Sequence, residues 1–353
     1  MNVLIEKDIF NSANSNEDIL ELSFLLHIIH YGKRYTLLLK DDITHCTAYN
    51  KLPSYEQETL NYTLVSTCVS SLSPDCTVSS KGVSENTKKI FSLSEAIKYL
   101  MQPLSIIVEN SFTDPHFIKA IIRCYRGSEL FFTHLTNGWI QFENAGGCGN
   151  VKNFLNGRLE YFNNKPKFLK CFILLDGDKR YPNHKITKYD NLKQNLGTWN
   201  VDYHILEKRC MENYLPIEAI PENNNTREWL NAYKYLTPEQ RDFLNIGSGF
   251  IGDANKLEKR KIELKKKRKR KFNEEQCLRK NLDKPIKLLY HSVSETNFKI
   301  LSHGIELSPF KTKYPLLFDE VQKVYKKSME KMTAHQTNHN ELQDIRNKIM
   351  KLM

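Results

Sequence analysis

The chain has 353 residues, of which 40% are hydrophobic and 11% aromatic, and its formal net charge is +11. This composition suits a packed globular protein and excludes an intrinsically disordered chain. No stretch reaches the roughly 18 uninterrupted apolar residues that a membrane span needs, and the first residues lack the pattern of a secretory signal. We therefore expect a cytoplasmic protein without a membrane partner.

Residues 1–95 combine an apolar stretch with a stretch rich in Ser, Thr and Cys. They contain no motif that indicates a chemistry. We expect them to form a small accessory α/β domain.

Residues 96–222 alternate strand and helix patterns. The segments that predict strands are 104–109, 138–144, 169–178 and 201–207. Helical patterns follow the first three of them, with apolar stripes that include Phe117 and Ile121, then Val151 and Leu155, then Tyr189 and Leu192. Short links between strands and helices in strict alternation predict a parallel sheet with crossover helices.

Residues 223–353 predict a helical C-terminal region, and they contain most of the net charge. Segment 256–271, KLEKRKIELKKKRKRK, has eleven Lys or Arg and two Glu, which leaves the rest of the chain near +2. Such a run binds polyanions through their phosphates, although it can also be a solvated, charge-rich helix. The residues that we expect to contact nucleic acid here are Lys265, Lys266, Lys267, Arg268, Lys269, Arg270 and Lys271.

Acidic residues stand where the predicted strands end. Glu109 ends the first strand, Asp176 and Asp178 end the third, and Glu212 lies just beyond the fourth. In an open parallel sheet, sites form at the carboxyl ends of the strands. Carboxylates are the ligands of Mg²⁺, and two such ions stabilise the attacking and leaving oxygens of a phosphoryl displacement. Taken singly, a Glu at a strand end is usually solvated and an Asp-Gly-Asp is common in turns.

In combination these segments resemble a Toprim domain, the module shared by topoisomerases, primases, small RNases and OLD nucleases. IIVENSFTDPHFI resembles the opening motif, FILLDGDKRYP resembles the DxD segment, and NAGGCGNVKNFL is similar to the turn after the second strand. LEKRCMENYLP is similar to a stretch of the OLD-like Toprim nucleases. The resemblance covers residues 96–222 and implies a Rossmann-like parallel sheet with flanking helices.

The resemblance also implies the site residues. Glu109, Asp176, Asp178 and Glu212 would be catalytic and would bind two Mg²⁺ or Mn²⁺ ions. Asp114 lies five residues after Glu109 rather than the usual four, and Asn110 replaces a Gly. Asp114 is therefore either a fifth metal ligand or an ordinary helix cap.

Several cations are candidates for contacts with the substrate. Lys179, Arg180, Lys208 and Arg209 flank the acids and could contact phosphate, or they could be solvated surface charges. Lys311 and Lys313 are further candidates for the catalytic cation that Toprim nucleases use.

The expected function is metal-dependent cleavage of DNA or RNA. The chain lacks the GxxxxGK[ST] motif of an ATPase, so the resemblance to OLD-like effectors implies a separate ATPase or sensor partner in anti-phage defence. The alternatives are a catalytically inactive Toprim module that binds nucleic acid or a partner protein, a topoisomerase-like or primase-like enzyme, and an unrelated nucleotide-binding module.

Overall fold

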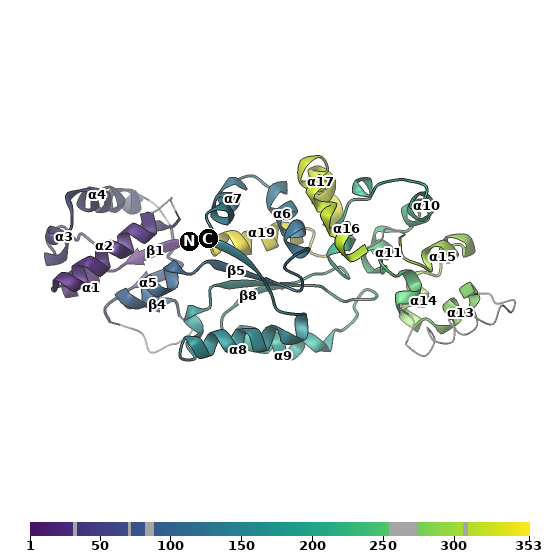
Figure 1. Cartoon of the computed structure of the whole chain (residues 1–353), viewed down its shortest axis with the longest axis horizontal. Coiled ribbons are helices and arrows are strands. Elements are labelled where there is room, and N and C mark those ends of the chain that lie inside the picture. Colours follow the sequence, from purple (N-terminus) through teal and green to yellow (C-terminus); the bar gives the residue numbers. More distant parts are fainter. Residues whose placement is uncertain (31–33, 70–71, 82–87, 254–273, 306–309) are drawn as a thin grey trace.

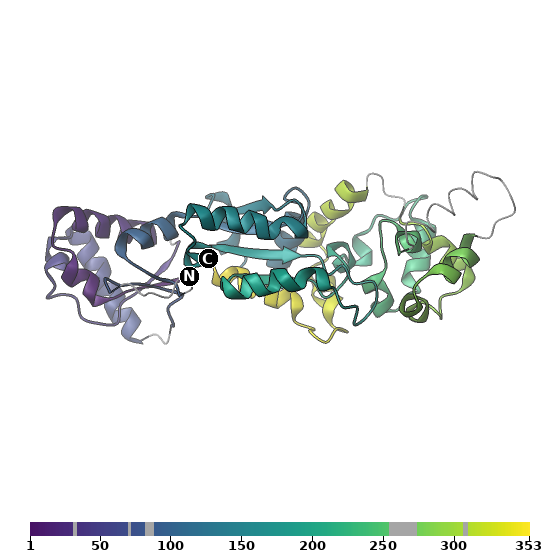
Figure 2. The ribbon, with the colours of Figure 1, turned by 90° about the horizontal axis from the view of Figure 1, so that it is seen from below.

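The structure is a computed structural model, and it describes residues 1–30, 34–69, 72–81, 88–253, 274–305 and 310–353. The molecule is elongated, with an N-terminal lobe, a central sheet and a group of C-terminal helices following one another along the long axis (Figure 1). The two chain ends lie close together where the N-terminal lobe meets the central sheet (Figures 1 and 2). The basic run, Lys265–Lys271 included, lies outside the described residues.

The N-terminal lobe is an α/β unit, as expected. Its four strands are parallel and lie in the order β2-β1-β3-β4. The strands are β1 (Asn2–Ile5), β2 (Thr36–Leu38), β3 (Cys76–Val78) and β4 (Ile90–Phe91). The helices are α1 (Lys7–Ser12), α2 (Asn16–His30), α3 (Thr47–Lys51), α4 (Ser54–Val69) and α5 (Leu93–Met101).

The central sheet confirms the predicted parallel arrangement. Its strands lie in the order β6-β5-β7-β8, and all of them are parallel. They are β5 (Leu104–Val108), β6 (Ile140–Asn144), β7 (Cys171–Leu175) and β8 (Asp202–Ile205). Every residue of β5 and β7 is buried, which is why these two strands read as continuous apolar runs.

Helices cover both faces of the central sheet (Figure 1). Ile106, Phe172 and Leu174 belong to the core beneath α6 (Asp114–Cys124), whereas Ile107 and Ile173 belong to the core on the opposite face. That second core is closed by α8 (Val151–Tyr161) and α9 (Asp190–Thr198). Alternate residues of one strand thus feed two cores, as the pleat of a strand requires. A further helix, α7 (Glu129–Thr136), precedes β6 and was not expected.

The C-terminal region is helical, as expected, and it shares the core of the central sheet. Phe318, Ile345 and Ile349 are buried in the same cluster as Ile106 of β5 and Phe117 of α6. The helices are α10 (Arg227–Lys234), α11 (Pro238–Phe243), α13 (Glu274–Asn281), α14 (Lys284–Leu289), α15 (Glu295–Leu301), α16 (Phe310–Leu316), α17 (Phe318–Lys323), α18 (Lys326–Glu330) and α19 (Glu341–Lys351).

A buried lysine joins the N-terminal lobe to the central sheet. The Nζ of Lys170, which directly precedes β7, donates to the hydroxyl of Tyr35 at 2.5 Å and to the carbonyl of Gln102 at 3.1 Å. Burial lowers the pKa of this ammonium well below its usual value. Separately, none of the described helices has both the length and the apolar character needed to cross a membrane.

Candidate metal centre

The acids that follow the central strands lie at one edge of the sheet. Glu109 directly follows β5, and Asp176 directly follows β7. These strands are neighbours, with Ile107 paired to Ile173, so their carboxyl ends open on the same side. The sequence placed the two acids on neighbouring strands, and the pairing agrees with that prediction.

Two further acids reach the same edge from other elements. Asp114 is the first residue of α6, and its carboxylate accepts the N–H of Asn110 at 2.8 Å, in the loop that follows Glu109. Glu212 lies in a short 3₁₀ helix, Met211–Tyr214, beyond β8. The residue before α6 is Thr113, so Asp114 does not occupy the N-cap position that the sequence allowed.

The pKa values show that these carboxylates are close enough to repel one another. Burial, followed by the charges of Glu212 and Glu109, raises the pKa of Asp176 well above its usual value. Burial is also the largest cause at Asp114, where the pKa rises to about 6. The pKa of Glu109 is raised by burial and then by Asp178. Clustered acids with raised pKa values are typical of functional sites, including cation-binding sites.

One carboxylate oxygen of the cluster has no partner. Oε1 of Glu109 is buried and accepts no hydrogen bond from any group that the structure describes. A buried acceptor without a partner costs free energy unless a ligand satisfies it. This oxygen is therefore available for a cation at the sheet edge.

The Asp-Gly-Asp loop is shaped by its glycine. A Cβ at Gly177 would lie 2.0 Å from the carbonyl oxygen of Lys208 and 2.3 Å from that of Leu206. Asp178 has a φ of 52°, in the left-handed region that Asp tolerates better than most residues. Its N–H donates to the carbonyl of Arg209 at 2.7 Å. The loop therefore fits tightly against the segment after β8, and only Gly fits between the two acids.

The sequence did not identify two residues that contact the acids, Lys188 and Tyr189. The ammonium of Lys188 is paired with the carboxylate of Asp178. The hydroxyl of Tyr189 lies 2.7 Å from the carbonyl of Asp176 and 2.9 Å from the carboxylate of Asp178. Although burial alone would lower the pKa of Lys188, its contact with Asp178 outweighs this and raises it. The sequence had placed Tyr189 only on the apolar stripe of the helix predicted after the Asp-Gly-Asp loop, and it gave no signal for Lys188.

The donor set suits a hard divalent cation, but the side chains do not surround one here. Among the described residues, no group of three or more His, Cys, Asp or Glu is arranged to hold a metal ion. The reason lies in the present partners of the carboxylates. Asp176 accepts the N–H of Met211 at 3.1 Å, and Asp178 is paired with Lys188. These contacts, together with mutual repulsion, compete with the binding of a cation by the same carboxylates.

The structure uses three of the four flanking cations internally. Lys208 is 0% exposed, and its Nζ contacts the carboxylate of Asp242 at 2.8 Å. Arg209 and Arg180 both bind Asp253, at 2.8 and 3.0 Å. These placements favour structural roles over the phosphate contacts that the sequence suggested, because the charges already have buried partners.

Lys179 differs from these three cations. It is half-buried, and within the described part of the chain its ammonium has no hydrogen-bond or ion-pair partner. It therefore remains a candidate for phosphate. Lys313 is exposed on α16, and the side chain of Lys311 lies outside the described residues.

C-terminal residues hold the loop that carries Glu212. Glu341, the first residue of α19, is 0% exposed and accepts from Tyr214 at 2.5 Å and from the N–H of Glu207 at 2.7 Å. The oxygen that accepts from Glu207 also lies 2.8 Å from the Nε2 of His204 in β8. This buried carboxylate fastens β8 and the following loop to the C-terminal helix.

Comparisons with models of protein families, with curated proteins and with solved structures find no match for this chain.

Proposed function

We propose that the chain is a metal-dependent nuclease of the Toprim type, which hydrolyses phosphodiester bonds of DNA or RNA. The observation that carries the proposal is the cluster of Glu109, Asp114, Asp176, Asp178 and Glu212, whose charges perturb one another at the carboxyl edge of a parallel sheet. A structural role does not explain this cluster, because burial and the charges of neighbouring acids raise the pKa of Glu109, Asp114 and Asp176, and such repulsion lowers stability in the absence of a cation.

Glu109, Asp176 and Asp178 would hold the first divalent ion, and Glu212 and Asp114 would complete the site. Bound Mg²⁺ or Mn²⁺ supplies Lewis-acid stabilisation of charge on the reacting oxygens. The protein contributes orientation, because Gly177 and the hydroxyl of Tyr189 fix the loop that presents Asp178. Lys188 lies beside Asp178 and would neutralise a phosphate oxygen once it leaves that carboxylate.

The substrate would be held by phosphate contacts. Lys179 beside the Asp-Gly-Asp loop and the basic run are the candidates, and such contacts carry no base information. Neutralising Lys265–Lys271 should weaken binding to all sequences alike and flatten the dependence of affinity on salt concentration. Fluorescence titrations at several salt concentrations test this. An unchanged slope would assign the run to the solvated surface.

A separate ATPase or sensor remains part of the proposal, as the resemblance to anti-phage effectors implies. The purified chain should therefore be assayed alone and with the product of any adjacent ATPase gene. Plasmid, single-stranded DNA and tRNA are the substrates to compare, with Mg²⁺, Mn²⁺ or chelator.

The matched variants are Asp176→Ala/Asp178→Ala and Asp8→Ala, which removes an acid from the edge of the other sheet. We expect cleavage by the wild type and by Asp8→Ala, and a loss of about 1,000-fold or more in the double variant, since each ligand supports the same charge stabilisation. Cleavage retained in the double variant contradicts the proposal. No cleavage by the wild type under any condition favours the inactive binding module.

A further inference from the structure

A second pocket lies on the far side of Lys208 from the acids. It has a volume of about 330 Å³, at the small end of the ~300–1,000 Å³ range of small-molecule sites. Its lining includes Lys208 and Asp242, with Arg241, Ser328, Lys331 and His335 around them. The backbone carbonyl of Lys208 touches Gly177, whereas its ammonium binds Asp242 in the wall of this pocket. The pocket shares no residue with the acid cluster, although Lys208 contacts the Asp-Gly-Asp loop through its backbone.

The charged groups in the pocket wall are already paired with one another. One oxygen of Asp242 binds the Nζ of Lys208 at 2.8 Å, and the other binds the Nε2 of His335 at 2.7 Å. Lys208 also donates to the carbonyl of Met332 at 2.8 Å. Because both oxygens of Asp242 are occupied, its negative charge is compensated and the imidazole is held in one orientation.

Three donors in the same pocket have no partner among the residues that the structure describes. Within the described ranges of the chain, the side chains of Arg241, Lys331 and Ser328 make no hydrogen bond and no ion pair. A guanidinium, an ammonium and a hydroxyl together match the several oxygens of a phosphate better than the two of a carboxylate. The pocket therefore presents a phosphate-binding set of donors beside an internally neutral wall.

Apart from Glu218, whose carboxylate also lines the pocket, the remaining lining is apolar. Ile217, Tyr233, Pro238 and Met332 form it, which suits an aromatic or apolar group attached to the phosphate. The volume admits one nucleotide rather than a duplex. Accordingly, we propose that this pocket binds a phosphomonoester carried on a nucleoside, either a free mononucleotide or the 5′-phosphorylated end of a strand. This inference does not depend on the nuclease proposal.

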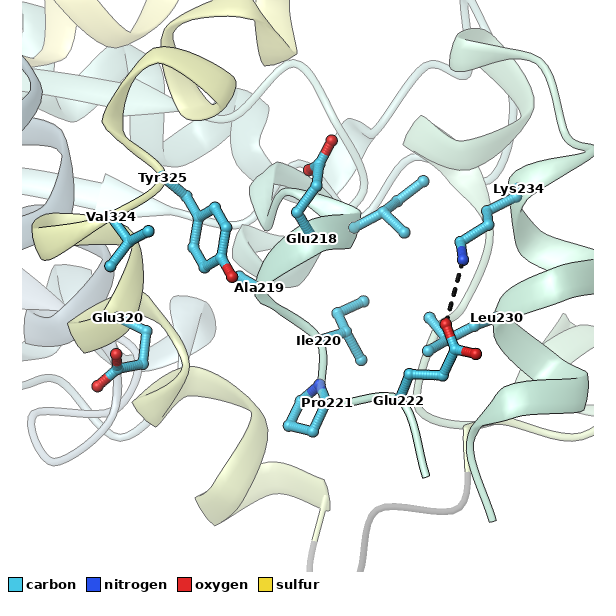
Figure 3. A pocket seen from close by; sticks show the side chains of 11 residues that line it. Glu218, Ala219, Ile220, Pro221, Glu222, Leu230, Lys234, Glu320, Val324 and Tyr325 are labelled. Atoms are coloured by element: carbon cyan, nitrogen blue, oxygen red, sulfur yellow. Dashed lines mark hydrogen bonds and ion pairs between the residues drawn. The ribbon is translucent and has the colours of Figure 1, made fainter. Parts of the chain in front are cut away.

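The adjoining pocket shows why the assignment is specific. It is larger, about 630 Å³, and shares Ile217 and Glu218 with the proposed phosphate site. Three carboxylates line it, those of Glu218, Glu222 and Glu320, and the ammonium of Lys234 is paired with Glu222 at 3.4 Å (Figure 3). A phosphate would meet repulsion there, so Lys234 provides a matched control for the cations of the proposed site.

The test is isothermal titration of the full chain in chelator, with adenosine 5′-monophosphate, adenosine and inorganic phosphate as probes. Chelator keeps metal-bound nucleotide away from the acid cluster. We expect the monophosphate to bind at least tenfold more tightly than adenosine. Arg241→Gln/Lys331→Gln should weaken its binding by tenfold or more, because two charge-assisted contacts are lost.

Three further variants and one pair of oligonucleotides sharpen the result. Lys234→Gln and Asp176→Asn/Asp178→Asn should leave binding of the monophosphate unchanged, and Glu218→Gln should strengthen it by removing a nearby negative charge. Comparing the binding of single strands that carry a 5′ phosphate with that of strands that carry a 5′ hydroxyl distinguishes a strand end from a free nucleotide as the ligand. Equal binding of adenosine and its monophosphate overturns the proposal. The proposal is also overturned if Arg241→Gln/Lys331→Gln melts like the wild type and binds the monophosphate with full affinity. Loss of binding in Asp176→Asn/Asp178→Asn would overturn it as well.

Discussion

The two sheets of this protein have the same topology but different chemistry at their carboxyl edges. Both are parallel and four-stranded, and in both the first strand lies between the second and the third. In both, an acid directly follows the first strand, Glu6 in one and Glu109 in the other. After the third strand the N-terminal sheet has Ser79 and Ser80, where the central sheet has Asp176-Gly177-Asp178.

The environments of single acids show what this difference does. Asp8, at the edge of the N-terminal sheet, accepts from the hydroxyl of Ser79 at 2.8 Å and from that of Ser80 at 2.9 Å. Although burial alone would raise the pKa of Asp8, these hydrogen bonds outweigh it and lower the pKa. Burial, followed by the charges of the neighbouring carboxylates, raises the pKa of Asp176. The two sheets share an open carboxyl edge, and the residues placed there decide whether an acid at that edge accepts hydrogen bonds or meets the charges of other acids.

The largest effect is expected from Gly177→Ala. Its Cβ would overlap two backbone carbonyls, so the loop and both aspartates must move. We expect a loss of about 2–4 kcal/mol in unfolding free energy and, if the chain is a nuclease, a cleavage rate at least ~100-fold lower. Gly157→Ala in α8 is the control, because nothing lies within 4 Å of its added Cβ. That change should stabilise the protein by about 0.5–1 kcal/mol. Equal melting temperatures for the two variants would refute the tight fit of the loop.

A smaller effect concerns the pH dependence of stability, and its sign differs between the carboxyl edges of the two sheets. Because the pKa of Asp176 is higher in the folded than in the unfolded state, folding favours its protonated form. Its contribution to stability is therefore full below the unfolded pKa and is lost as pH rises through the folded pKa. Asp114, with a pKa of about 6, adds to this loss between roughly pH 4 and 7. Asp176→Asn should raise the melting temperature of the metal-free protein at pH 7 by ~2–4 °C.

Asp8 should behave in the opposite way. Its pKa is lowered, so its contribution is present above the unfolded pKa and is lost as pH falls through the folded pKa. Asp8→Asn should therefore lower the melting temperature at pH 7 and change it little in strong acid. Thermal melts of both variants in chelator between pH 3 and 8 measure the difference. If Asp8→Asn and Asp176→Asn changed the melting temperature at pH 7 in the same direction, the proposed difference between the two edges would be contradicted.

The smallest effect on stability is expected from Lys188→Met. The side chains of Lys188 and Asp178 are 42% and 44% exposed, and solvent-exposed ion pairs contribute only about 0–1 kcal/mol. Removing the ammonium should, however, increase the affinity for Mn²⁺ by a factor of about 2–5, because a competing cation leaves Asp178. Calorimetric titration with Mn²⁺ measures this, and an unchanged affinity would show that the Lys188 contact does not compete with metal.

The sequence predicted the parallel central sheet because strand and helix patterns alternate over residues 96–222 with short links, and because β5 and β7 are almost entirely apolar. The ends of the predicted strands then locate Glu109, Asp176 and Asp178. It did not predict the individual strands of the N-terminal lobe, since β3 and β4 have only three and two residues. Nor did it predict α7, whose ELFFTHLT lacks a clear apolar stripe.

Charged residues marked the limit of sequence reasoning at the site. Lys208 and Arg209 look like surface cations beside the acids, yet their partners, Asp242 and Asp253, lie more than thirty residues further along the chain. Lys188 lies only ten residues after Asp178, but it was missed because their contact depends on how the loop between them folds back. Composition shows how many charges a segment has, but only the packing shows which of them are already paired.

Mn²⁺ binding tests the central claim most directly, because it does not require the substrate or a partner protein. The wild type and Asp8→Asn should gain thermal stability as Mn²⁺ is added in place of chelator, since a ligand of the folded state stabilises by mass action. Asp176→Asn/Asp178→Asn should show no such gain, although it melts at or above the wild-type temperature in chelator. Equal stabilisation of the double variant by Mn²⁺, or none in the wild type, would contradict the assignment of the acid edge as a metal centre.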